Sequence, residues 1–93
     1  MVFEMHQLEA IDPARRMFNR DVRIEVDESG YRGQFAYEGF SLKTASHMAV
    51  EDVLSDIVIK LYRKGFSDIR SRINFREDRY LAEREAWIYY KAS

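Results

Sequence analysis

The sequence predicts an α+β fold: a four-stranded, antiparallel-rich sheet with one long helix on one face and a short helix at the N-terminus. A helical stripe of apolar residues occupies the middle of the chain, and alternating apolar and polar residues occupy a segment on each side of it. The order is therefore hairpin–helix–hairpin, or ββαββ, with the helix covering the sheet. With 93 residues, 46% of them hydrophobic, the chain fits a single α+β domain over residues 1–93.

The N-terminal segment has the least regular pattern. Asp12 followed by Pro13 is typical of a helix start, because Asp can cap the helix and Pro fits its first turn. We therefore expect a short helix that ends at about Asn19. Residues 1–11 precede it as an arm or an edge strand, and their pattern does not decide between the two.

The first hairpin is predicted between this segment and the long helix. Apolar and charged residues alternate strictly over residues 21–27, which is typical of a half-buried strand. Residues 28–30 supply the turn, and residues 31–40 supply the returning strand. Gly33 and Gly39 weaken that strand and indicate a bulge or a close approach.

The clearest element is a helix over residues 45–64. Thr44 or Ser46 can accept a backbone N–H at its start, and Gly65 can end it in the left-handed conformation. The apolar residues of its stripe step by four, three and four: Val50, Leu54, Ile57 and Leu61. Such a stripe faces a core.

A second hairpin follows, with its turn at residues 76–79. If Phe75 pairs with Tyr80, apolar residues gather on one face of the ribbon. The same register sets arginines opposite glutamates on the other face, Arg72 opposite Glu83 and Arg70 opposite Glu85. A slip of one residue would destroy both matches, so the chemistry of the side chains predicts this register.

Charge and composition exclude several classes of function. The charges of the 15 basic and 16 acidic side chains nearly cancel, which argues against a protein that binds nucleic acid through a net positive charge. Without cysteine the chain has no disulfide and no thiolate metal site, and it fits a reducing cytoplasm, where we expect it. No apolar stretch approaches the length that spans a bilayer, so we expect no membrane partner.

The sheet face opposite the helix is the expected contact surface, because tryptophan, tyrosine and arginine dominate binding hot spots. The proposed contact residues are Arg70, Arg72, Glu83, Glu85, Trp87 and Tyr89, with the two glutamates orienting the arginines. These residues predict a small, non-enzymatic interaction module that binds a second copy of itself or another protein. The alternative is a solvated face whose ion pairs contribute little and whose aromatic residues the N-terminal segment partly covers.

A nucleic-acid surface is the second functional hypothesis. Single-strand binders often stack bases on aromatic residues of a sheet that also carries arginines. The residues of this surface would be Arg15, Arg16, Arg20, Arg72, Arg76 and Arg79. Most of them have an acidic residue placed to neutralise them, which disfavours this hypothesis.

The sequence predicts no catalytic residue, no cofactor and no metal site. His47 and Glu51 stand four residues apart and could share a helix face, but no third ligand has matching spacing. The sequence also has no glycine-rich motif of the kind that binds phosphate groups. We therefore expect that the protein is not an enzyme.

Overall fold

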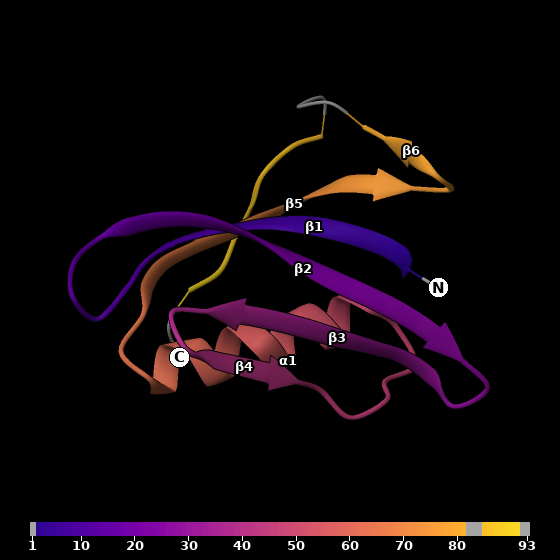
Figure 1. The fold of residues 1–93 in the computed structure, drawn as a ribbon, viewed down its shortest axis with the longest axis horizontal. Helices are drawn as coiled ribbons and strands as arrows, with labels where there is room; N and C mark the ends of the chain where they lie inside the picture. The colour runs from indigo at the N-terminus through magenta and orange to yellow at the C-terminus, as the bar shows by residue number, and fades with distance from the viewer. Residues whose placement is uncertain (1, 82–84, 92–93) are drawn as a thin grey trace.

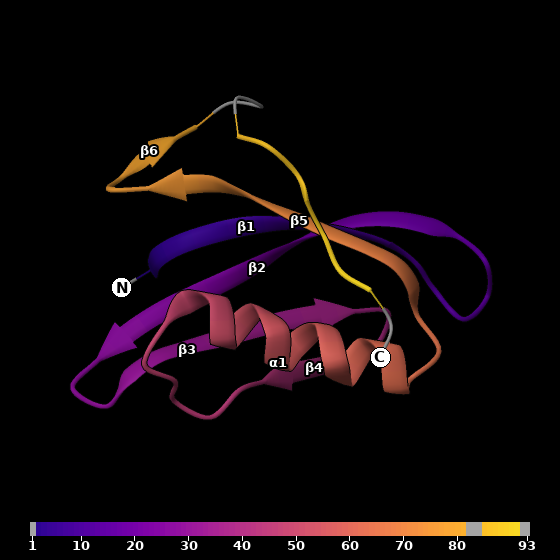
Figure 2. The same ribbon diagram turned by 180° about the vertical axis from the view of Figure 1, so that it is seen from behind.

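The computed structural model describes residues 2–81 and 85–91, which form an antiparallel sheet and a helix (Figure 1). The elements in chain order are β1 (Val2–Ile11), β2 (Met17–Asp27), β3 (Gly30–Tyr37), β4 (Phe40–Lys43), α1 (Val50–Arg63), β5 (Ser67–Arg76), β6 (Arg79–Tyr80) and β7 (Ile88–Tyr89). Within the described residues the sheet has the order β4-β3-β2-β1-β5-β6, and β7 also pairs with β5. Helix α1 packs on one face of this sheet (Figures 1 and 2), so the predicted α+β class is confirmed.

The sheet is larger than the predicted four strands because the N-terminal segment is its central strand. β1 pairs with β2 on one side and with β5 on the other, so it is neither an arm nor an edge strand. Its inward face mixes charged and apolar side chains: Glu4, His6, Leu8 and Ala10 are all buried. The hydrophobic pattern of a central strand is therefore hard to see in the sequence.

The predicted short helix after Asp12 is wrong, because this segment is the loop of the β1–β2 hairpin. The carbonyl of Asp12 accepts the N–H of Arg15 at 2.9 Å, and the N–H of Asp12 donates to the carbonyl of Arg16 at 2.9 Å. The Asp12 carboxylate also accepts the hydroxyl of Tyr37. Asp followed by Pro suits the first two positions of a tight turn as well as a helix start. Here the pairing of β1 with β2 selects the turn.

Helix α1 begins at Val50 rather than at residue 45, because the preceding residues remain extended along β3. The Thr44 hydroxyl accepts the N–H of Gly33 at 3.0 Å, and the backbone of His47 pairs with that of Tyr31. The predicted cap by Thr44 or Ser46 is therefore wrong, and Ala49 caps the helix without a side-chain hydrogen bond. In the part of the chain that the structure describes, no helix is both long enough and apolar enough to cross a membrane.

The core lies between α1 and the inward face of the sheet. Three residues of the predicted stripe, Leu54, Ile57 and Leu61, are buried together with the flanking Val53 and Val58, whereas Val50 at the start of the helix is only partly buried. They pack with buried strand residues, among them Leu8, Val22, Ile24, Phe35 and Ile69. A Cβ at Gly33 would lie only 2.5 Å from Cγ1 of Val53, which confirms the close approach predicted at that glycine.

The second hairpin keeps the predicted register only next to its turn. Phe75 pairs with Tyr80, as expected. Farther along β5, Arg70 pairs with Tyr89 instead of Glu85, so the predicted Arg70–Glu85 pair is wrong. The partner predicted for Arg72, Glu83, lies outside the described residues.

Hydrogen bonds made by Tyr90 account for this change of register. The phenol of Tyr90 shares a hydrogen bond of 2.8 Å with the hydroxyl of Ser71, which is fully buried. The hydroxyl of Tyr62 on α1 donates to the carbonyl of Tyr90 at 2.7 Å. These bonds tie the last described residues to both β5 and α1. They determine which residues of the C-terminal segment can pair with Arg70.

Candidate interaction site

The sheet face turned away from α1 is called the outer face below. The even-numbered residues Leu8 and Ala10 of β1 are buried under α1, so Gln7 and Glu9 point to the outer face. Register places Arg72 opposite Gln7 and Arg70 opposite Glu9. These residues form, together with two aromatic residues, what we call the arginine–tryptophan cluster: Gln7, Glu9, Arg70, Arg72, Trp87 and Tyr89.

Arg70 lies at the centre of this cluster. Its Nε donates to Oε1 of Glu9 at 2.9 Å, and its Nη1 donates to the hydroxyl of Tyr89 at 3.0 Å. Its Cζ lies 4.0 Å from the centroid of the Trp87 ring, within the range of a cation–π interaction. The bond to the Glu9 carboxylate raises the pKa of Arg70 above its usual value. The guanidinium therefore keeps its charge and has a well-defined orientation.

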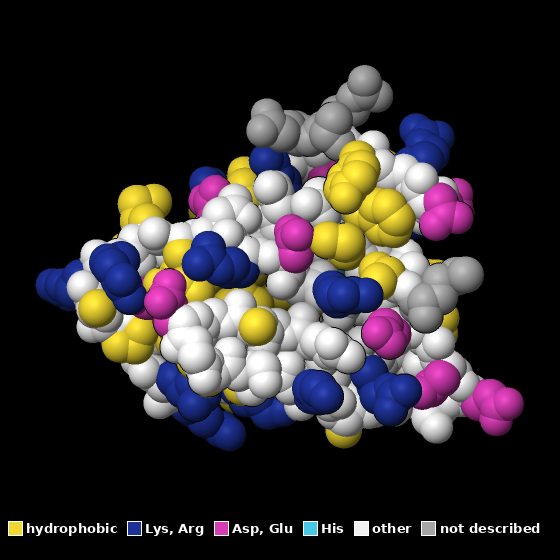
Figure 3. Space-filling view, viewed as in Figure 1, with side chains coloured by type: hydrophobic (Ala, Val, Ile, Leu, Met, Phe, Trp, Pro, Cys, Tyr) yellow, Lys and Arg dark blue, Asp and Glu magenta, His cyan; other side chains and the backbone are white. Residues whose placement is uncertain are grey.

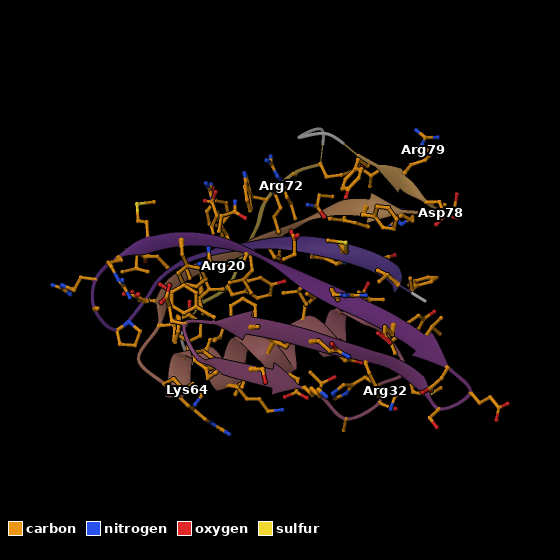
Figure 4. The ribbon with its side chains drawn as sticks, viewed as in Figure 1. Arg20, Arg32, Lys64, Arg72, Asp78 and Arg79 are labelled. Carbon is orange, nitrogen blue, oxygen red and sulfur yellow. The ribbon has the colours of Figure 1, made fainter. Side chains whose placement is uncertain are left out.

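Arg72 contacts the same indole. Its Nε donates to Oε1 of Gln7 at 2.8 Å, and its Cζ lies 4.3 Å from the centroid of the Trp87 ring. Each such contact contributes about 0.5–1 kcal/mol at an exposed site. Two guanidinium groups thus hold Trp87, which is partly exposed, at the boundary between β5 and the C-terminal segment (Figure 4 labels Arg72).

The structure brings together four of the six predicted contact residues: Arg70, Arg72, Trp87 and Tyr89. Glu85 is exposed and lines a cavity on the opposite side of the sheet, beside Arg76. Glu9 orients Arg70 in place of the expected Glu85, and Gln7 accepts a hydrogen bond from Arg72. The expected role of Glu83 lies outside the described residues. Sequence reasoning missed Glu9 and Gln7, although the polar–apolar alternation from Gln7 to Ala10 is a strand signal.

Exposed aromatic residues continue from the cluster toward the β5–β6 hairpin. Tyr80 is 73% exposed and packs edge-on against Phe75, with ring centroids 5.3 Å apart. Met5 pairs with Phe75 across β1 and β5. Hydrophobic side chains gather over β5 and β6 on this face (Figure 3), while charged side chains surround them.

The six arginines of the predicted nucleic-acid surface divide among three places. They lie at the β1–β2 end (Arg15, Arg16, Arg20), in the cluster (Arg72) and at the β5–β6 hairpin (Arg76, Arg79). Figure 4 labels one arginine of each place: Arg20, Arg72 and Arg79. Arg16 donates to Asp12, Arg76 donates to Glu4, and Nη2 of Arg20 lies 3.7 Å from Oε1 of Glu38. The structure therefore does not gather these arginines into one basic patch.

His47 contacts a carboxylate other than the one that its spacing suggested. Its Nε2 lies 2.9 Å from Oδ2 of Asp56, and Nζ of Lys60 lies 2.8 Å from Oδ1 of the same carboxylate. Glu51 takes no part in these contacts. Across residues 2–81 and 85–91, no group of three or more acidic or histidine side chains could hold a metal ion.

Comparison with family models, with curated proteins and with solved structures found no match to this chain.

Proposed function

We propose that this protein is a small, non-enzymatic interaction module that forms a homodimer through its outer face, with the arginine–tryptophan cluster at the centre of the contact. The observation that carries the proposal is an indole held by two guanidinium groups on a face that α1 does not cover. Beside it, Tyr89 is 70% exposed. A cytoplasmic location is part of the proposal, because a cysteine-free chain needs no oxidising compartment.

The cluster suits binding because its side chains are already ordered. Glu9 and Gln7 orient the two arginines before any partner arrives. Ordering a long side chain at an interface costs about 0.5–1.5 kcal/mol, so pre-ordered arginines bind at a lower cost. Trp87 and Tyr89 add large rigid contact areas with few rotatable bonds.

Charges on the rest of the outer face favour a second copy of the chain as the partner. Asp21, Arg23 and Glu25 alternate with buried residues along β2 and therefore point outward. On β3, Arg32 lies opposite Glu25. In a two-fold contact every residue meets a residue of the same surface, so a face with both signs can match itself. A domain with a small core also gains stability from dimerisation.

Sedimentation velocity over the micromolar range tests the dimer. We expect Trp87→Ala to weaken association about tenfold or more, because central aromatic residues dominate interfaces. Ile59→Ala is the matched control, since Ile59 is 46% exposed on α1, on the other side of the molecule. A wild-type protein that stays monomeric throughout, or a dimer that Trp87→Ala leaves unchanged, would refute the proposal.

Nucleic-acid binding is the second candidate, and one observation favours it: Trp87 and Tyr89 contact an arginine on a sheet whose neighbouring hairpin exposes Tyr80. Titration with single-stranded RNA and DNA at two salt concentrations tests it. Saturable, salt-sensitive binding that is lost in Arg72→Ala/Arg79→Ala would support this candidate. Arg76 is unsuitable for the test because it pairs with the buried Glu4.

A further inference from the structure

Strands β2 and β3 pair along only part of their length. Their register runs from Asp27 opposite Gly30 to Arg23 opposite Gln34, and the pairing ends there. Beyond this point, among the described residues, β2 pairs only with β1 and β3 pairs only with β4. The two strands therefore diverge from their common hairpin in the middle of the sheet (Figures 1 and 2).

A cavity of about 380 Å³ lies where the two strands diverge, and we call it the β2–β3 slot. Its lining comes from both faces of the sheet. Arg23 and Ala36 are exposed on the outer face, whereas Phe35 and Leu42, which lie opposite each other, point to the side of α1. Phe35 is only 2% exposed and forms the floor of the slot.

Backbone polar groups form the sides of the slot. In an antiparallel pair, alternate residues exchange hydrogen bonds, and the residues between them turn their N–H and C=O the other way. The N–H of Asp12 donates to the carbonyl of Arg16, so the odd-numbered residues of β2 turn these groups toward β3. The N–H of Thr44 donates to the carbonyl of Gly33, so the even-numbered residues of β3 turn theirs toward β2.

Asp21 and Ala36 are the next two residues that this alternation would join, but β2 and β3 do not pair there. Both residues are exposed, and both line the cavity. A strand edge with unpaired N–H and C=O groups is a template for a further strand. Two such edges face each other across the slot, so an extended backbone between them can pair on both sides.

The charge around the slot is mainly positive. Arg20, Arg23 and Lys43 line the cavity, and Asp21 is the acidic residue among its described lining. Arg20, labelled in Figure 4, lies 3.7 Å from Glu38. Arg23 and Lys43 have no hydrogen-bond or ion-pair partner among the side chains that the structure describes. These two cations favour an acidic partner.

We propose that the β2–β3 slot binds an extended acidic peptide of a partner protein, which adds a strand between β2 and β3. Alternate side chains of a strand point to opposite faces. Apolar side chains of the peptide therefore contact Phe35, while its acidic side chains lie beside Arg23 and Lys43. This inference goes beyond the proposed dimer, which is centred on the arginine–tryptophan cluster.

Peptides with both ends blocked test the preference for charge. The sequence Val-Glu-Val-Glu-Val has the expected alternation, and Val-Lys-Val-Lys-Val reverses its charge. We expect saturable binding of the acidic peptide by calorimetry and binding of the basic peptide that is weaker by about tenfold or more. Single-stranded pentathymidylate, an anion without a peptide backbone, should bind more weakly than the acidic peptide.

Methylation of the peptide backbone distinguishes strand addition from attraction between charges. N-methylation of the glutamates removes the N–H donors along one edge of the acidic peptide, and N-methylation of the valines removes those along the other edge. In a slot between two strands, each modification should abolish binding. At the outer edge of a sheet, only one of them would.

Hydrogen exchange locates the bound peptide. The N–H of Ala36 turns toward the slot, so we expect fast exchange in the free protein and slow exchange with the acidic peptide bound. Leu42 is the control, because it pairs with Phe35 within the sheet. Its amide should exchange slowly in both states.

Variants separate the charge of the slot from general charge. Arg23→Gln/Lys43→Gln should weaken binding of the acidic peptide several-fold, because exposed charges contribute modestly. Arg15→Gln/Arg63→Gln removes two exposed cations elsewhere and should leave binding unchanged. All four positions are exposed, so both variants should fold. Trp87→Ala should keep peptide binding, which separates this proposal from the dimer.

Four results would overturn the proposal. Absence of binding at millimolar acidic peptide would remove the site. Equal binding of the N-methylated peptides would make the slot an anion site without strand pairing. Unchanged exchange at Ala36, or loss of peptide binding in Trp87→Ala, would place the peptide elsewhere. Tighter binding of pentathymidylate would make this face a nucleic-acid surface.

Discussion

His6 is a buried titratable residue, with only 6% of its surface exposed. It is buried in the central strand, and the effect of burial outweighs that of the hydrogen bond that His6 donates to Glu4, so its pKa is lowered. A histidine in the unfolded chain has a pKa near 6.5. Below that value the unfolded state binds a proton that native His6 does not bind, so protonation favours unfolding.

We therefore expect the free energy of unfolding to fall as the pH is lowered from about 7.5 to about 5.5. Urea titrations at a series of pH values measure it. His6→Gln should flatten this dependence, whereas His47→Gln, the control at the other histidine, should keep it. An unchanged pH dependence in His6→Gln would contradict the assignment.

Tyr90 connects three parts of the molecule through one side chain and one carbonyl. Its phenol bonds to the buried Ser71, and burial raises the pKa of Tyr90, so the phenol stays protonated. Tyr90→Phe leaves the Ser71 hydroxyl without this bond. We expect a loss of about 1–2 kcal/mol in the free energy of unfolding. Tyr89→Phe is the control, since Tyr89 is exposed and its loss should be smaller.

At the scale of elements, contact between α1 and β3 depends on the absence of a side chain at Gly33. An added Cβ would meet Cγ1 of Val53 at 2.5 Å and Cδ1 of Ile57 at 3.0 Å. Gly33→Ala should therefore lower the free energy of unfolding by about 1–3 kcal/mol, as overpacking does.

A double variant distinguishes this steric effect from a change in strand propensity. Val53→Ala removes the atom that the new Cβ would meet. The loss in Gly33→Ala/Val53→Ala should be smaller than the sum of the single losses by about 1 kcal/mol. Strict additivity in chemical denaturation would show that the helix does not oppose the substitution.

Two elements show how a local signal can fit more than one structure. Asp12 and Pro13 satisfy the rules for a helix start and for a tight turn, and the neighbouring strands select the turn. Phe75 and Tyr80 confirm the predicted pairing at the second hairpin. The pairing then changes because Tyr90 is hydrogen-bonded to Ser71 of β5 and to Tyr62 of α1.

At the scale of the whole molecule, β1 supplies residues to both faces of the sheet. Its outward residues Gln7 and Glu9 orient the arginines of the cluster, and its inward residues Glu4 and His6 are buried on the side of α1. Successive residues of a strand point to opposite faces, so one central strand can serve two surfaces. This position was not evident in the sequence, because polar residues stand on both faces of β1.

The sequence by itself determined the α+β class, the apolar stripe of α1, the β2–β3 hairpin and the turn of the β5–β6 hairpin. These features depend on side-chain periodicity and turn residues, which act over a few positions. Tertiary structure alone decided the central place of β1, the pairing of Arg70 with Tyr89, and the meeting of Glu9 with Arg70. Strand neighbours distant in sequence are selected by mutual burial and hydrogen bonding, which no single segment encodes.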